Sequence, residues 1–152
     1  RIIKNKVFEI RTDTCFSQVV KKCASITRKE QDGTWITKDM MHAYLHLHQL
    51  GYAHSFEAFK DGQLVGGLYG VSIGKAFFGE SMFSEVSNAS KVTLNALVNF
   101  CMQHHFLFID AQVETAHLKS LGASVIPRDV FLELLDSALK SPTIKGIWKL
   151  NH

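Results

Sequence analysis

Three successive stretches with the alternation of β-strands fill residues 54–82, and they constrain the fold more than any other part of the chain. The first two, 54–60 and 63–73, flank the dipeptide Asp61-Gly62, which is a strong signal for a tight hairpin turn. The third stretch begins at Gly74, directly after the second, and runs to Met82. Strands that succeed one another so closely pair antiparallel, so the centre of the chain is predicted to be a β-meander.

Helices and further strands are predicted on both sides of this meander. Helical spacing, capping residues and apolar runs predict helices at 16–26, 37–50, 88–104 and 128–139, a helical turn at 115–121, and strands at 1–12, 106–112 and 125–126. This order of elements resembles the α+β fold of the GNAT-like N-acyltransferases, which implies one mixed, mainly antiparallel sheet flanked by helices. Gly66, Gly67 and Gly70 in the second meander strand predict a β-bulge or a close approach by a ligand.

Length and composition fit a single domain over residues 1–152. The chain has 152 residues, 46% of them hydrophobic, which is enough to bury one core. We expect no signal peptide, because the first residues are basic and no apolar stretch follows them, and no apolar run approaches the roughly 18 residues that span a bilayer. Cys15, Cys23 and Cys101 are odd in number and lack CxxC spacing, which is typical of reduced thiols in the cytoplasm. The chain begins at Arg1 without an initiator Met, as a fragment of a longer protein would.

Charge is distributed unevenly, although the net charge is only +3. The basic lead-in, 1–33, holds eight Lys/Arg against four Asp/Glu, the body, 34–137, holds six against ten, and the basic tail, 138–152, adds three lysines and no acid. Basic flanks around an acidic middle suit a polyanion outside and a cation in a central cleft. Ordinary solvated segments explain the same counts, and from charge alone they are the favoured interpretation.

Glu80 is an acidic residue that follows the apolar run 76–79 inside one strand. Burial of a carboxylate is costly without a cationic partner. Apart from Lys75 at the start of the strand, no Lys or Arg lies at a partner spacing, which indicates that a substrate supplies the cation. A strand alternation that turns Glu80 to solvent is the alternative interpretation.

Asp110 and Gln112 end the most apolar strand-like stretch, 106–109. Their i, i+2 spacing points both side chains to one face of a strand. Polar groups at the end of a buried strand are common site residues, whereas a loop-capping role for Asp110 explains them about equally well. Both residues are therefore candidates for a functional site.

Asn88, Ser90 and Lys91 open a predicted helix whose free backbone N–H groups favour an anion such as a phosphate. An ordinary N-cap is the alternative, and taken by itself it is the better interpretation. The helix start lacks the glycine-rich pyrophosphate loop of coenzyme A enzymes. This absence argues against the usual acetyltransferase chemistry.

No metal ion or cofactor is expected. His42, His46 and His48 invite a metal interpretation by their spacing, but there is no HExxH motif and no third ligand is indicated. Ser81 lacks the GxSxG context of serine hydrolases, and Cys101 lies among apolar residues, as core thiols do. None of these residues is predicted to carry chemistry.

Seven short strings, taken together, resemble the leucyl/phenylalanyl-tRNA–protein transferases. In chain order they are 34–37 (TWIT), 50–55 (LGYAHS), 65–70 (VGGLYG), 79–84 (GESMFS), 88–91 (NASK), 109–112 (IDAQ) and 121–123 (LGA). The match runs from about Cys23 to Phe131, and the series GESMFS, NASK and I-D-x-Q is very specific. The resemblance implies a catalytic domain with a GNAT-like fold and without coenzyme A or metal.

That family moves Leu or Phe from Leu-tRNA or Phe-tRNA to the N-terminal Arg or Lys of acceptor proteins, which marks them for N-end-rule degradation. By resemblance, Glu80 holds the cationic N-terminal residue of the acceptor. Gln112 orients the attacking α-amine, and Asp110 fixes Gln112 and adds negative potential. The apolar wall for the donor side chain would include Leu68, Phe77, Met82, Leu94 and Leu97, although such residues form a core in any fold. The donor tRNA would lie on the basic flanks, with Asn88, Ser90 and Lys91 as weaker candidates for contact.

The chain departs from the family in two respects. Relatives usually carry a small N-terminal domain with GGDLS-like and FPWY-like motifs, and neither motif occurs in this sequence. Relatives also tend to have Met and Phe where this chain has Leu68 and Leu97, which leaves the preference between Leu and Phe open. Two other functions stay open: a GNAT-like enzyme with another acyl donor such as acyl-CoA, and a non-catalytic module that recognises basic N-termini. We expect a cytoplasmic monomer without a membrane segment.

Overall fold

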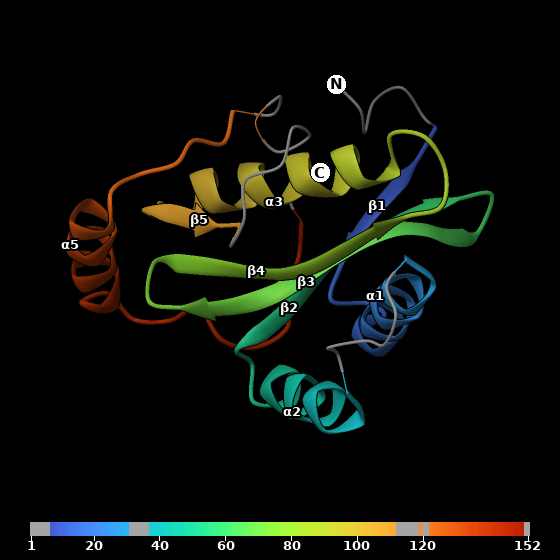
Figure 1. Cartoon of the computed structure of the whole chain (residues 1–152), viewed down its shortest axis with the longest axis horizontal. Coiled ribbons are helices and arrows are strands. Elements are labelled where there is room, and N and C mark those ends of the chain that lie inside the picture. The colour runs from blue at the N-terminus through green and yellow to red at the C-terminus, as the bar shows by residue number, and fades with distance from the viewer. Residues whose placement is uncertain (1–6, 31–36, 112–118, 120–121, 151–152) are drawn as a thin grey trace.

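The computed structural model describes residues 7–30, 37–111, 119 and 122–150, which form one five-stranded sheet with helices on both faces (Figure 1). The strands are β1 (Glu9–Thr12), β2 (Ala53–Lys60), β3 (Gln63–Ile73), β4 (Ala76–Ser84) and β5 (Phe108–Asp110), and the helices are α1 (Phe16–Glu30), α2 (Lys38–Gln49), α3 (Ala89–Gln103) and α5 (Arg128–Leu139). The strands lie in chain order; β1 to β4 pair antiparallel, and β5 is parallel to β4. This confirms the predicted mixed, mainly antiparallel sheet.

Two clusters of buried side chains pack the helices onto opposite faces of the sheet. On one face α3 covers the strands, with Phe100 edge-on against Phe56 at 6.0 Å between ring centroids. On the other face α1 buries Val19 and Val20 in a second cluster that also contains Tyr69 of β3. In Figure 1, α3 lies above the sheet, α1 and α2 lie below it, and α5 stands at one end. None of the helices described here is both long and apolar enough to cross a bilayer.

Most element boundaries agree with the sequence. α5 begins and ends where predicted, and α2 begins after Thr37, whose hydroxyl accepts a hydrogen bond from Met40 N at 3.1 Å. Of the strand predicted at 1–12, residues 1–6 lie outside the described residues, and β1 covers Glu9–Thr12; α1 is longer than predicted. The strand predicted at 125–126 is wrong, because Val125 is 74% exposed and, within the described ranges, no strand pairs with it. The turn predicted at 115–121 lies almost entirely outside the described residues.

A β-bulge in β4 leaves Glu80 without a residue opposite it in β3. Tyr69 pairs with Ser81 and Gly70 pairs with Gly79, so the register skips Glu80. A side chain at Gly70 would collide with a carbonyl oxygen of β4, which explains why the bulge requires glycine there. The sequence predicted either a bulge or a ligand near these glycines, and the structure shows the bulge.

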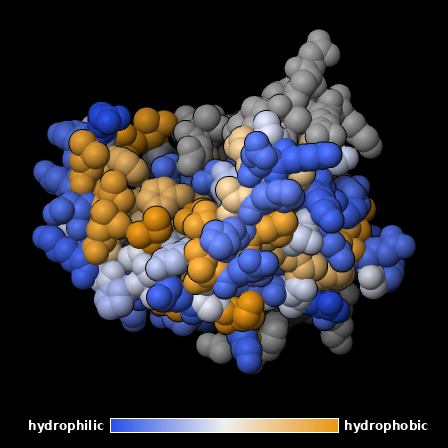
Figure 2. All heavy atoms as spheres, turned by 90° about the horizontal axis from the view of Figure 1, so that it is seen from below, coloured by the Kyte–Doolittle hydropathy of each residue, from blue (hydrophilic) through white to orange (hydrophobic). Residues whose placement is uncertain are grey.

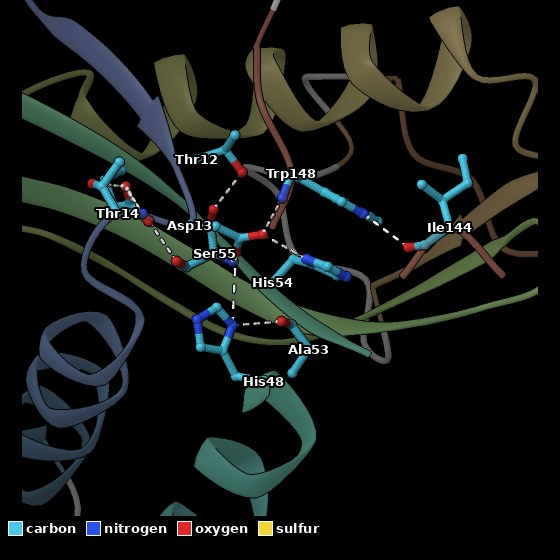
Figure 3. Close-up of polar contacts among 10 residues, drawn as sticks. Thr12, Asp13, Thr14, His48, Ala53, His54, Ser55, Ile144 and Trp148 are labelled. Carbon is cyan, nitrogen blue, oxygen red and sulfur yellow. Dashed lines mark hydrogen bonds and ion pairs between the residues drawn. The ribbon is translucent and has the colours of Figure 1, made fainter. Parts of the chain in front are cut away.

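Asp13 is a fully buried carboxylate that joins three segments far apart in the sequence (Figure 3). It accepts hydrogen bonds from His54 Nδ1 at 2.7 Å, from the backbone N–H of Ser55 at 2.9 Å and from that of Trp148 at 2.8 Å. The His54 and Trp148 rings stack with centroids 3.6 Å apart. Asp13 thereby fixes the extended segment after α5 against β2.

A second buried carboxylate, Glu57, makes the stability of the fold depend on pH. Its oxygens accept hydrogen bonds from the hydroxyls of Thr14 and Ser55, but burial dominates and raises the pKa of Glu57 above its usual value. A carboxyl whose pKa is raised by folding stabilises the fold while it is protonated. This contribution is complete below the unfolded pKa and is lost as the pH rises through the folded pKa.

We therefore expect the free energy of unfolding of the unmodified chain, relative to that of Glu57→Gln, to fall as the pH rises from about 4 towards neutrality. The fall should be about 1.4 kcal/mol for each unit by which the folded pKa exceeds the unfolded one. Urea unfolding at several pH values measures it. Glu133→Gln, on the exposed side of α5, is the control and should leave the pH dependence unchanged. A pH-independent difference at Glu57 would contradict the expectation.

Candidate active site

Glu80 is half-buried on β4 and receives a hydrogen bond from α2. The Tyr44 hydroxyl donates to Glu80 Oε1 with an oxygen–oxygen distance of 2.7 Å. Of the Lys, Arg and His side chains that the structure describes, none places a nitrogen within 4.0 Å of this carboxylate. The carboxylate is thus neither fully exposed nor ion-paired in the described chain, and it can accept a cation from a ligand.

Tyr44 is held beside Glu80 by aromatic neighbours. Its ring lies edge-on against Tyr69 at 5.1 Å between centroids, and Tyr69 packs edge-on against Phe16 at 5.8 Å. Burial, followed by the hydrogen bond to Glu80, raises the pKa of Tyr44, so the phenol stays protonated and donates. Nothing in the sequence around Tyr44 marks it as a site residue, because an aromatic residue on the sheet-facing side of a helix is typical of a core position.

Asp110 ends β5 directly beside the strand that carries Glu80. It pairs with Phe78 in the parallel ladder, and a Cβ atom added to Gly79 would lie 3.5 Å from its carbonyl oxygen. The structure therefore brings Glu80 and Asp110 onto adjacent strands, two residues apart in register. Gln112 lies outside the described residues, so its pairing with Asp110 stays a prediction.

A cavity of about 580 Å³ opens beside Asp110, between the end of β5 and the start of α5. Its wall combines the side chains of Phe108, Phe131 and Leu134 with the charged residues Asp110 and Arg128. Figure 2 shows apolar side chains at the same end of the molecule, and the exposed apolar residues of α5 include Val130 and Leu132. The volume lies in the range of small-molecule sites.

The five residues predicted to form the donor wall lie around one core on the α3 face of the sheet. Leu68, Phe77 and Leu97 belong to the core itself and are at most 3% exposed, whereas Met82 and Leu94 are half-buried and pack against it. The structure thus brings all five together. Such clustering is expected of a core and of an apolar pocket alike, so their role in binding a donor stays a prediction.

The start of α3 is not capped in the ordinary way. Asn88 is the N-cap residue, with the left-handed φ of 72° that asparagine tolerates, but its side chain makes no capping hydrogen bond. The backbone N–H of Ser90 donates to Ser84 Oγ at 3.3 Å, and Lys91 is exposed. Contact between this helix start and a phosphate stays a prediction.

Of the histidines and cysteines noted in the sequence, His48 and Cys101 are packed against other parts of the fold. His48 stacks on Phe16 at 4.3 Å between centroids and donates from Nδ1 to the Ala53 carbonyl, while His42 and His46 are exposed. Within the described ranges, no group of three or more His, Cys, Asp or Glu residues could hold a metal ion. Burial raises the pKa of the Cys101 thiol to about 12, so the thiol stays protonated in the core, as its sequence context indicates.

Comparisons with known proteins point to one family. A family model described as leucyl/phenylalanyl-tRNA protein transferase matches residues 1–136. Among curated proteins, the leucyl/phenylalanyl-tRNA–protein transferase of Desulfatibacillum aliphaticivorans is 50% identical over 150 residues, which cover 99% of this chain and 64% of the relative. The protein of the same name from Hydrogenovibrio crunogenus is 52% identical, over 98% of this chain and 60% of the relative. The chain thus spans about three fifths of the length of the curated relatives it matches.

Solved structures with a similar fold include acetyltransferases of low sequence identity. An aminoglycoside acetyltransferase from a soil metagenomic sample superposes with a TM-score of 0.59 at 13% identity and covers 83% of this chain and 93% of that one. A possible acetyltransferase from Clostridium difficile superposes with a TM-score of 0.60 at 11% identity, over 80% of this chain and 93% of that one. These likenesses establish the GNAT-like fold that the order of elements predicted.

Proposed function

We propose a function for this chain on the basis of its family: it belongs to the leucyl/phenylalanyl-tRNA–protein transferases. We infer that it is the catalytic body of an aminoacyltransferase that moves Leu or Phe from aminoacyl-tRNA to the N-terminal Arg or Lys of acceptor proteins. This transfer marks the acceptors for N-end-rule degradation, and we expect the enzyme to act as a monomer in the cytoplasm. The observation that carries the proposal is the half-buried Glu80 carboxylate, whose hydrogen-bond donor is an uncharged phenol.

The environment of Glu80 supports binding of a cationic acceptor residue. A partly buried carboxylate gains most from a charged partner, because screening by water is reduced there. The Tyr44 hydroxyl satisfies part of the hydrogen-bonding capacity of Glu80 but none of its charge. A guanidinium or ammonium group of the acceptor would neutralise the charge of Glu80 and fill its remaining hydrogen-bonding capacity.

The transfer step needs an amine and an ester held together near Asp110. The α-amine nitrogen of the acceptor attacks the ester carbonyl carbon, an amide bond forms, and the bond from that carbon to the ribose oxygen breaks. The amine loses a proton, and the ribose oxygen gains one. A free α-amine has a pKa of about 8, so a useful neutral fraction exists at cellular pH. In the proposal Gln112 orients the amine, and Asp110 fixes Gln112 and adds negative potential.

The donor would be held by an apolar wall and by basic flanks. The wall is the set of five residues predicted from the sequence, of which the half-buried Met82 and Leu94 offer the most accessible surface. Met82 is unbranched and flexible, which suits a pocket that accepts both Leu and Phe. The exposed lysines Lys140, Lys145 and Lys149 of the basic tail are available for the phosphates of tRNA.

A transfer assay tests the proposal. With radiolabelled Phe-tRNA or Leu-tRNA, the purified chain is expected to label a peptide that begins with Arg, but not the same peptide with an acetylated N-terminus. Asp110→Asn is expected to lower kcat and to leave the KM for the peptide nearly unchanged. Transfer from acetyl-CoA but not from tRNA would favour a GNAT-like enzyme with another donor. Peptide binding without transfer in the full-length protein would favour a non-catalytic reader of basic N-termini.

A further inference from the structure

We propose that Tyr44 sets the relative use of Arg-initiated and Lys-initiated acceptors, by occupying one of the two oxygens of the Glu80 carboxylate. Tyr44 acts through Glu80, so it is a positioning residue rather than a catalytic one. The inference rests on the proposed function, because it assumes that Glu80 receives the cationic side chain of the acceptor.

The geometry gives the two carboxylate oxygens different tasks. The hydrogen bond from Tyr44 ends on Oε1 at 2.7 Å, and, of the side chains that the structure describes, no other one hydrogen-bonds to Glu80. Oε2 is therefore the oxygen that a ligand can approach without displacing the phenol. A cation that binds one oxygen can use Oε2 alone, whereas a cation that spans both oxygens must share Oε1 with the Tyr44 hydroxyl.

Arg and Lys differ in this requirement. A guanidinium binds a carboxylate most strongly through two parallel N–H···O bonds, one to each oxygen. An ammonium is a compact point charge that one oxygen can satisfy. Tyr44 therefore weakens the preferred contact of Arg while it leaves that of Lys nearly intact. The unmodified site should bind the two residues more evenly than a free carboxylate would.

The phenol cannot easily withdraw to give way to a guanidinium. Tyr69, which packs edge-on against the Tyr44 ring, is only 1% exposed and is itself packed against Phe16. The Thr37 cap stabilises the start of the helix that carries Tyr44. Because the raised pKa of Tyr44 keeps the phenol protonated, the donor persists across the pH range in which the enzyme would work.

The test is the Tyr44→Phe variant, which removes the hydroxyl and keeps the ring packing against Tyr69. We expect the ratio of kcat/KM for an Arg-initiated peptide to that for the matching Lys-initiated peptide to rise about fivefold or more, the scale of one gained charge-assisted hydrogen bond. The ratio of the two dissociation constants, measured by fluorescence anisotropy with labelled peptides, should shift in the same direction. Tyr52→Phe is the matched control, since Tyr52 is likewise half-buried and its ring contacts Lys145 rather than Glu80.

The outcomes separate this inference from the proposed function. An unchanged ratio, or a shift towards Lys, would overturn the role of Tyr44 even if transfer is normal. A shifted ratio of dissociation constants without any transfer would support the role of Tyr44 in choosing between Arg and Lys, and it would overturn the proposed activity. Binding no stronger than that of an Ala-initiated peptide would overturn both. Tyr44→Met, which keeps an apolar side chain of similar length, provides the same measurement if Tyr44→Phe does not fold.

Discussion

The Glu80→Gln variant is expected to transfer Phe to an Arg-initiated peptide with a kcat/KM that is about 30-fold to about 5,000-fold lower than that of the unmodified chain. Truncating one member of a desolvated charge pair typically costs about 2 to 5 kcal/mol, and each 1.36 kcal/mol corresponds to about tenfold. Gln has the shape of Glu and can still accept the hydrogen bond from Tyr44, so the change removes charge and little else. Steady-state transfer assays at saturating aminoacyl-tRNA measure the effect.

A second glutamate five residues further along the chain provides the control. Glu85 pairs with Lys22 at 2.8 Å, and both side chains are well exposed, at 42% and 37%. Such surface pairs contribute little, so Glu85→Gln should leave kcat/KM within about twofold of the unmodified value. Equal losses in the two variants would mean that general negative charge, rather than a specific contact at Glu80, attracts the acceptor.

The Asp13→Ala variant is expected to lose about 3 to 5 kcal/mol of unfolding free energy, the usual cost of removing one member of a buried charged group and its partners. Asp13 receives three hydrogen bonds, and its loss leaves the backbone N–H groups of Ser55 and Trp148 without an acceptor. His54 loses the oxygen that Nδ1 faces, and its Nε2 atom already lacks a partner among the described atoms. Urea unfolding followed by circular dichroism measures the loss.

Asp136→Ala is the matched control for that variant. Asp136 pairs with Lys140 at 3.5 Å on the exposed side of α5, where the two side chains are 76% and 74% accessible. Its removal should change the unfolding free energy by less than about 0.5 kcal/mol. A comparably small loss for Asp13→Ala would show that the segment after α5 is held by the stacking of Trp148 rather than by the carboxylate.

Local signals explain which parts of the fold could be predicted. A hairpin turn and a helix cap depend on a few neighbouring residues, so the turn at Asp61-Gly62 and the cap at Thr37 could be predicted from the sequence. The strand predicted at 125–126 failed because two β-branched residues indicate a strand only where a neighbour is available to pair with them. Whether an edge of the sheet is free is a property of the whole fold, which a local pattern does not contain.

In the candidate site, too, features that depend on neighbouring residues could be predicted, whereas contacts between distant residues could not. Glu80 could be singled out because an acid in an apolar strand is unusual on its own. Its contact with Tyr44 spans 36 residues, and that of Asp13 with Trp148 spans 135, so neither leaves a spacing that a sequence pattern could reveal. The bulge could be anticipated from the glycines, but which residue it leaves unpaired depends on the register of β3 against β4.

The hydrogen bond between Asp13 and Trp148 has a consequence for synthesis. Asp13 lies near the beginning of the sequence, and the backbone N–H that it binds belongs to Trp148, whose side chain fills the space between His54 and Phe100. A ribosome that has translated the whole sheet has still not supplied the residue that closes the core. The packing between His54 and Phe100 is therefore completed only after Trp148, which follows all five described strands along the chain, has been synthesised.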